Sequence, residues 1–157
     1  MQTDAALPAS PAIVLGGGGV LGATQVGMLR ALLESGFQPR LVVGTSVGAI
    51  NGAAIAADPT AEGVQALTKL WGSLADTGMF TDTMLARVST LARHRTHLYS
   101  PGPLRELLAG HLPATFEDLV VPFQCVAASI EKASAHWFST GPLTQAVLAS
   151  CAVQNSS

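Results

Sequence analysis

The sequence has few charged residues, few aromatic rings and only two cysteines. Charged side chains make up 11% of the 157 residues, against about a quarter in an ordinary soluble domain. The formal net charge is −2, so no basic surface is available to attract nucleic acid. Cys125 and Cys151 are too few for a disulfide framework and do not form a CxxC pair, which favours two buried thiols in a reducing compartment.

The N-terminus lacks the basic start of a secretory signal, because no Lys or Arg precedes Arg30. Pro8, Pro11 and the glycines within 16–22 interrupt the uncharged run 5–29, so this run does not predict a membrane-spanning helix. No group of His, Cys, Asp and Glu has the spacing of metal ligands. We expect a soluble, cytoplasmic protein without a metal ion, and the sequence carries no signal for its oligomeric state.

Apolar residues make up 48% of the chain, and the mean hydropathy is +0.40. This composition predicts a compact core of Ala, Val and Leu, and the length fits one domain. Residues 1–11 are predicted to be a flexible leader of small residues and proline, and residues 12–157 to be the folded domain. Within it, 12–15 and 41–43 are all-apolar runs, typical of strands buried on both faces.

Helical patterns follow both of these strands. Apolar residues at helical spacing end before Gly36, which stands at a C-cap position, and a helix of small residues runs over 47–57 and stops before Pro59. This alternation predicts a parallel α/β sheet. Further along, the pattern predicts a helix capped by Thr60, a short helix over 104–109, strands over 120–130 and 135–138, and a last helix near Pro142.

The motif Gly44-Thr45-Ser46-Val47-Gly48 is a G-x-S-x-G sequence placed between a strand and a helix. A nucleophilic serine has to project from a sharp, strained turn at the end of its strand. Flanking glycines allow the backbone to approach closely, and the following helix directs its positive end at the serine. The sequence therefore predicts that Ser46 is a nucleophile and that Gly44 and Gly48 shape its turn.

A second motif, Gly16 to Gly22, follows the first strand and opens the first helix. Backbone N–H groups of such a loop can converge on a negatively charged oxygen. Because neighbouring parallel strands end at the same edge of a sheet, this loop and Ser46 are expected to face one crevice.

Together, Gly17-Gly18-Gly19-Val20-Leu21-Gly22 and Gly44-Thr45-Ser46-Val47-Gly48 resemble the patatin-like phospholipases. The stretches 27–32, 49–52 and 141–152 are also similar to that family. The resemblance implies a three-layer α/β/α fold with a mostly parallel central sheet. It further implies a lipid acyl hydrolase that uses a Ser–Asp dyad and no cofactor, with Ser46 as nucleophile and the amides of Gly17, Gly18 and Gly19 as the oxyanion hole.

The sequence departs from the family at the second dyad residue. The family's aspartate precedes a glycine, whereas no aspartate of this chain is followed by glycine, so none is assigned to the dyad. We interpret the chain as lacking the C-terminal portion of the domain. An alternative hypothesis is an inactive patatin-like fragment that acts as an interaction module. Leu21 stands where many family members carry Arg or Lys, a change that leaves the backbone donors in place.

Three further interpretations stay open. Gly17-x-Gly19-x-x-Gly22 also fits a dinucleotide-binding fingerprint, but no acidic residue ends the second strand. His136 and Asp118 are candidates for a Ser-His-Asp triad. The segment 79–97 can be a lid that meets acyl chains and phosphate head groups in peripheral contact with a membrane, or an ordinary amphipathic helix with a solvated basic face.

Overall fold

The computed structural model describes residues 10–76, 102–129 and 132–152. Most of the predicted leader and the whole predicted lid at 79–97 lie outside these residues. The described elements are β1 (Ala12–Leu15), the short 3-10 helix η1 (Gly19–Leu21), α1 (Gly22–Glu34), β2 (Leu41–Thr45), α2 (Val47–Ala57), α3 (Ala61–Asp76), α5 (Gly102–His111), the 3-10 helix η2 (Phe116–Asp118), β3 (Phe123–Ser129), β4 (Ser134–Phe138) and α6 (Leu143–Cys151).

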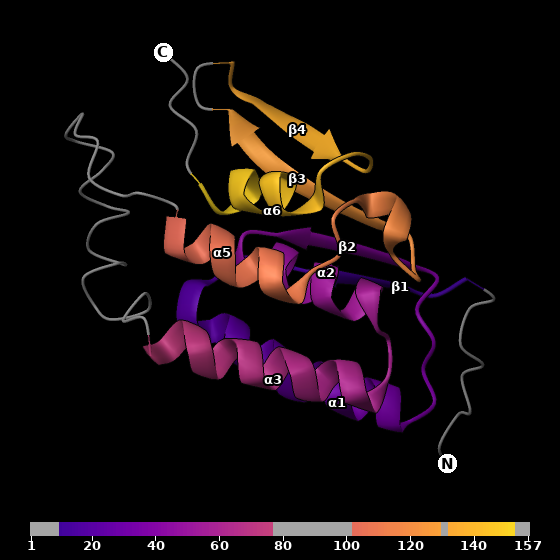
Figure 1. Cartoon of the computed structure of the whole chain (residues 1–157). Coiled ribbons are helices and arrows are strands. Elements are labelled where there is room, and N and C mark those ends of the chain that lie inside the picture. Colours follow the sequence, from indigo (N-terminus) through magenta and orange to yellow (C-terminus); the bar gives the residue numbers. More distant parts are fainter. Residues whose placement is uncertain (1–9, 77–101, 130–131, 153–157) are drawn as a thin grey trace.

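The strands form one sheet in the order β1-β2-β3-β4. The pairs β1–β2 and β2–β3 are parallel, and β4 returns antiparallel to β3. Helix α2 packs against all three parallel strands, and α6 packs against β3 (Figure 1). The predicted α/β class, a mostly parallel sheet flanked by helices, is confirmed.

The helices form two tiers on the sheet. Helices α2 and α6 lie against the strands, while α1 and α3 lie side by side and contact α2 from outside, and α5 contacts α3 and α6 (Figure 1). The buried apolar side chains form one cluster between these layers, with Leu29 of α1, Val42 of β2, Ile55 of α2, Leu70 of α3 and Val147 of α6 among its members. A single core therefore supports both the sheet and the helices.

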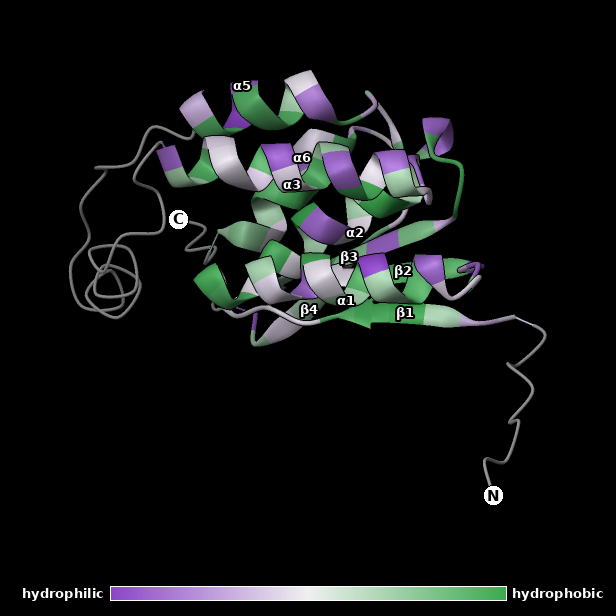
Figure 2. Cartoon of the chain, turned by 90° about the horizontal axis from the view of Figure 1, so that it is seen from below, coloured by the Kyte–Doolittle hydropathy of each residue, from purple (hydrophilic) through white to green (hydrophobic). Residues whose placement is uncertain are grey.

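Strand β1 is buried on one face only. Ile13 and Leu15 are buried, whereas Val14 is 74% exposed, and Figure 2 shows β1 as an apolar strand at the margin of the sheet. The prediction of burial on both faces is wrong at Val14. The physical reason is the strand order. Each parallel strand is added on the same side of the one before it, and the crossover connections are right-handed. The connecting helices therefore lie on the same face of the sheet, and Val14 points to the other face.

The helix ends follow local chemistry. Helix α1 ends just before Gly36, which has a φ of 85°, a backbone conformation that glycine adopts without steric cost. Thr60 Oγ1 accepts a hydrogen bond from the Gly63 amide at the start of α3 (3.3 Å), as an N-cap residue should. The predicted cap positions of these two helices are confirmed.

Candidate active site

Ser46 stands at the junction of β2 and α2 in a conformation that few residues adopt. Its φ is 56° and its ψ is −125°, and positive φ is uncommon for any residue with a Cβ. Such strain persists only where the surroundings enforce it, and it concentrates at active sites. The side chain is half-buried, so it remains within reach of a small molecule. This is the conformation that the G-x-S-x-G motif predicts for a nucleophile.

The glycines on either side of Ser46 are required by close backbone approach. A Cβ on Gly44 would lie 2.3 Å from the carbonyl oxygen of Gly48, and a Cβ on Gly48 would lie 2.1 Å from the carbonyl oxygen of Leu15. Real Cβ atoms do not approach backbone oxygens so closely. Glycine at both positions therefore lets the start of α2 press against the ends of β1 and β2, which fixes the tight turn at Ser46.

The glycine loop after β1 lies directly beside Ser46. Leu15 is paired with Gly44 in the parallel register, so the loop and the serine leave the sheet at the same edge. A Cβ on Gly17 would lie 3.3 Å from Ser46 Cβ and 4.0 Å from Ser46 Oγ. Gly18 and Gly19 have φ values of 152° and 57°, which glycine tolerates best. The predicted juxtaposition of the two motifs is present in the structure.

Ser46 also caps the positive end of a helix. Its carbonyl oxygen accepts hydrogen bonds from the amides of Ala49 (2.8 Å) and Ile50 (3.3 Å). The first turn of α2 carries no acidic side chain that would offset the partial positive charge of the helix terminus. A helix terminus of this kind attracts negative charge, so an anionic oxygen placed beside Ser46 would be stabilised.

Ser150 of α6 is a site residue that sequence reasoning did not single out. Its Oγ accepts a hydrogen bond from the Ser46 amide (2.9 Å) and donates one to the carbonyl oxygen of Val126 on β3 (2.5 Å). The local signal is a serine on the buried face of α6, whose other buried residues, Leu143, Ala146 and Val147, are apolar. Because the Ser46 amide donates to Ser150, it is not free to bind an anionic oxygen.

Comparisons with known proteins show the family of this chain. The family model described as "Patatin-like phospholipase" matches residues 13–154. The chain belongs to the patatin-like phospholipase family. It is 31% identical over 140 residues to the mouse "Patatin-like phospholipase domain-containing protein 7", covering 88% of this chain and 10% of that protein. It is likewise 31% identical over 143 residues to "Lysophospholipase nte1" of Aspergillus terreus, covering 90% of this chain and 9% of that protein.

Solved structures of low sequence identity share the fold. The ExoU–SpcU complex of Pseudomonas aeruginosa matches with a TM-score of 0.58 at 19% identity, covering 92% of this chain and 36% of the matched chain. VipD of Legionella pneumophila matches with a TM-score of 0.57 at 16% identity, covering 89% and 42%. The chain thus spans about a tenth of the curated relatives named above and less than half of these structures.

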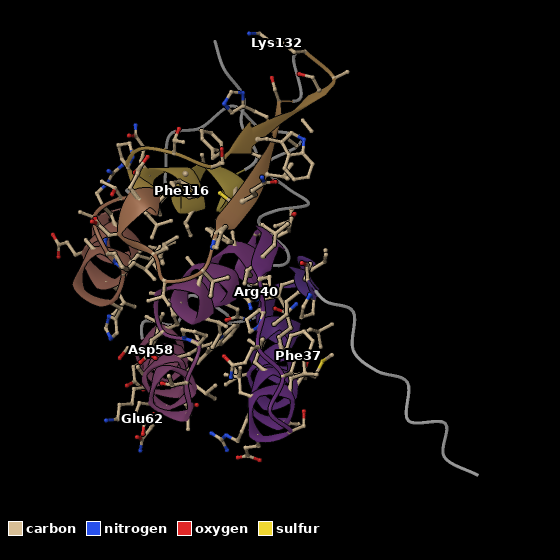
Figure 3. All side chains as sticks on the ribbon, turned by 90° about the vertical axis from the view of Figure 1, so that its right-hand side faces the viewer. Phe37, Arg40, Asp58, Glu62, Phe116 and Lys132 are labelled. Carbon is tan, nitrogen blue, oxygen red and sulfur yellow. The ribbon has the colours of Figure 1, made fainter. Side chains whose placement is uncertain are left out.

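Two aspartates of this patatin-like domain lie far from the serine. Asp58 caps the C-terminal end of α2 and lies near Glu62 at the start of α3 (Figure 3). Asp118 accepts hydrogen bonds from the Thr115 amide and hydroxyl. It is close in sequence to Val121, whose amide donates to the Ala56 carbonyl at that same end of α2. Ser46 caps the other end, about 15 Å away by the rise of an α-helix. Neither carboxylate is therefore placed to act as its base.

His136 is also separated from Ser46. It lies on β4 opposite Ala127, and β3 stands between β4 and the strand that leads to Ser46. Two strand spacings amount to roughly 10 Å, whereas a general base has to come within about 3 Å of the proton that it removes. The structure does not bring the proposed triad of Ser46, His136 and Asp118 together.

The two cysteines of the patatin-like domain are poor nucleophiles. Burial raises the pKa of the Cys125 thiol to about 12, and burial with the neighbouring Cys125 raises that of Cys151 to about 12. A thiol reacts as its thiolate, so neither cysteine is an effective nucleophile near neutral pH. Within the described ranges, no three His, Cys, Asp or Glu side chains form a group that could hold a metal ion, and none of the helices described there is long and apolar enough to cross a membrane.

Proposed function

We propose that this chain is the nucleophile-bearing part of a lipid acyl hydrolase that cleaves carboxylic esters of phospholipids or related acyl lipids. The observation that carries the proposal is the strained backbone of Ser46 at the start of α2, with Gly17 directly beside it. Family membership supports a lipid ester as substrate. The name "Lysophospholipase nte1" of the Aspergillus relative supports the same substrate class.

The chemistry assigned to the site is acyl transfer in two steps. Ser46 Oγ attacks the ester carbonyl carbon, a base takes the hydroxyl proton, and the carbonyl oxygen becomes an oxyanion. Amides of Gly17, Gly18 and Gly19 hold this oxyanion, a contribution worth about 10²–10³ in rate for a single donor. The tetrahedral intermediate then expels the alcohol, which takes up a proton, and water releases the fatty acid from Ser46 in a second attack.

Exposed apolar side chains next to the loop support a lipid substrate and peripheral contact with a membrane. Val20 and Leu21 follow the oxyanion glycines and are 46% and 67% exposed, and Met28 on α1 is 61% exposed. Apolar groups at the mouth of a site can insert among acyl chains at the level of the lipid head groups. Leu21 adds an apolar side chain at a position where many family members carry Arg or Lys.

No residue of this chain is assigned as the base. Asp58, Asp118 and His136 are excluded by their distance from Ser46, and the family's Asp-Gly motif is not found in the sequence. A serine hydroxyl without a base is a weak nucleophile. The chain by itself is therefore expected to turn over slowly.

The test combines turnover with covalent labelling. Hydrolysis of a p-nitrophenyl acyl ester and labelling by a fluorophosphonate are measured for the wild type, for Ser46→Ala and for Ser139→Ala, which changes an exposed serine in a loop. We expect labelling at Ser46 in the wild type and in Ser139→Ala, and none in Ser46→Ala. Turnover or labelling that survives in Ser46→Ala contradicts the proposal. A wild type that neither reacts nor labels also contradicts it and favours the interaction module.

A further inference from the structure

A continuous chain of side-chain hydrogen bonds connects the second tier of helices to the glycine loop. Trp71 Nε1 on α3 donates to Asn51 Oδ1 on α2 (2.8 Å), and Asn51 Nδ2 donates to Gln25 Oε1 on α1 (2.8 Å). Gln25 Nε2 then donates to the carbonyl oxygen of Gly16 (2.9 Å). Three helices that pack together in Figure 1 thus reach one peptide group beside the candidate nucleophile.

The direction of these hydrogen bonds is fixed at Trp71. An indole N–H can only donate, so the amide oxygen of Asn51 has to face it. The Asn51 NH₂ group is then committed to Gln25 Oε1 and to the carbonyl oxygen of Gly22 (2.9 Å). Because Gln25 accepts with its oxygen, its own NH₂ group is the one that faces Gly16.

Burial makes this arrangement costly to change. Asn51 is fully buried in the middle of α2, where an apolar residue would suit both the core and the helix better. All its contacts named above are of good hydrogen-bond length. Rotating the amide by half a turn would set NH₂ against the indole N–H and leave buried groups without hydrogen-bond partners, which is unfavourable.

The held carbonyl determines where an amide of the loop points. In a trans peptide the C=O of one residue and the N–H of the next are opposed within one rigid plane, and the structure has no cis peptide bond among its described residues. Holding the Gly16 oxygen toward Gln25 therefore turns the Gly17 N–H away from Gln25. Gly17 is the loop residue that lies beside Ser46, and Asn51 holds the other end of the loop through Gly22.

We propose that Gln25 and Asn51 are positioning residues that preset the Gly17 amide of the oxyanion loop before substrate binds. The inference rests on the proposed function for its catalytic meaning, but its structural half can be tested alone. Preset donors do not have to reorganise during the reaction, and a displacement of about 1 Å in a site can cost 10²-fold in rate. Trp71, which also packs within van der Waals reach of Gly22, sets the direction of the network.

The deciding variant is Gln25→Glu, compared with Gln65→Glu on the exposed face of α3. A carboxylate can still accept from Asn51 but cannot donate to the Gly16 oxygen, whereas a protonated carboxyl group can. In ¹H–¹⁵N spectra we expect the Gly17 amide signal of Gln25→Glu to differ from the wild type at pH 7. It should return toward the wild-type position as the introduced carboxyl group protonates, below roughly pH 5. Gln65→Glu should leave the signal unchanged.

A Gly17 signal that coincides with the wild type at every pH overturns the proposal, and so does an equal change in Gln65→Glu. If Gln25→Glu does not fold, Gln25→Met removes the same donor without adding charge, and the same comparison applies at pH 7. The rate of Ser46 labelling by a fluorophosphonate is the second readout. It should fall about ten- to a hundredfold in Gln25→Glu at pH 7 and recover relative to the wild type at low pH.

The two readouts separate two kinds of failure. Absence of wild-type labelling contradicts the proposed function, while the Gly17 signal still decides whether Gln25 orients the loop. Normal labelling of the wild type with an unmoved Gly17 signal in Gln25→Glu leaves the proposed function standing and refutes the positioning role. A mere loss of stability lowers the melting temperature but does not produce a pH-dependent return of one loop amide.

Discussion

Ser150→Ala removes the hydroxyl that joins α6 to the backbone of the candidate nucleophile. The hydroxyl accepts from the Ser46 amide and donates to the Val126 carbonyl. Alanine has neither function, and the Ser46 N–H loses its partner in a part-buried position. A buried donor left unsatisfied costs about 1–3 kcal/mol, and we expect a loss of about 1–2 kcal/mol here because water can partly reach the group.

For a domain of this size, each 1 kcal/mol lowers the melting temperature by about 2–4 °C. Ser150→Ala should therefore melt roughly 2–8 °C below the wild type in a calorimetric scan. Labelling of Ser46 by a fluorophosphonate should slow as well, because a strained backbone costs about 1–3 kcal/mol and relaxes when a restraint is removed. The matched control Ser139→Ala, at an exposed loop position, should change neither quantity.

Two results would refute this reasoning. A melting temperature of Ser150→Ala within about 1 °C of the control would mean that water fully replaces the hydroxyl. An unchanged labelling rate in a destabilised variant would mean that the remaining contacts alone hold Ser46 in its conformation. The first result removes the energetic role of Ser150, and the second removes its role at the nucleophile.

Two further predictions concern packing and protonation. Gly48→Ala should prevent folding or lower the free energy of unfolding by several kcal/mol, because its Cβ would lie 2.1 Å from the Leu15 carbonyl oxygen. A Cβ on Gly72 would meet nothing within 4 Å, so Gly72→Ala should stabilise the domain by about 0.5–1 kcal/mol. Urea unfolding followed by circular dichroism measures both variants, and equal stabilities would contradict the geometry. The pKa values of Cys125 and Cys151 are raised to about 12 from 9.0, so the folded state keeps protons that the unfolded state releases above pH 9. Stability contributed by these thiols is complete below pH 9 and is lost as pH rises toward 12, and Cys125→Ala should flatten that decline in unfolding midpoints measured from pH 8 to pH 11.

Much of the fold could be predicted because its signals are local. Strand β1 and helix α2 have the bounds predicted for the runs 12–15 and 47–57. Neighbouring residues determine both elements, because glycine follows the apolar strand and Asp58-Pro59 ends the helix. The adjacency of Gly17 and Ser46 also followed, because parallel strands end at one edge. Exposure of Val14 could not be predicted, since it depends on which face the later crossovers occupy.

The contacts that complete the site are those that local patterns cannot reveal. Ser150 is 104 residues from Ser46 in the sequence, and nothing in the apolar pattern of α6 marks its partner. A tryptophan among the apolar residues of α3 indicates only packing, whereas the indole N–H of Trp71 donates to Asn51, 20 residues away. A polar residue on the buried face of an apolar helix signals that a partner exists, but only the tertiary structure identifies that partner.

The conformation of Ser46 is a property of the whole domain rather than of its pentapeptide. The motif places a serine between two glycines, but a positive φ at a residue with a Cβ is unfavourable by itself. Three separate elements offset this cost. The end of β1 presses on Gly48, α2 ties the carbonyl of Ser46 into its first turn, and α6 binds its amide through Ser150. Ser150 lies 104 residues after Ser46 in the sequence. Local sequence is therefore enough to form the turn, whereas the strained geometry of Ser46 depends on the docking of α6.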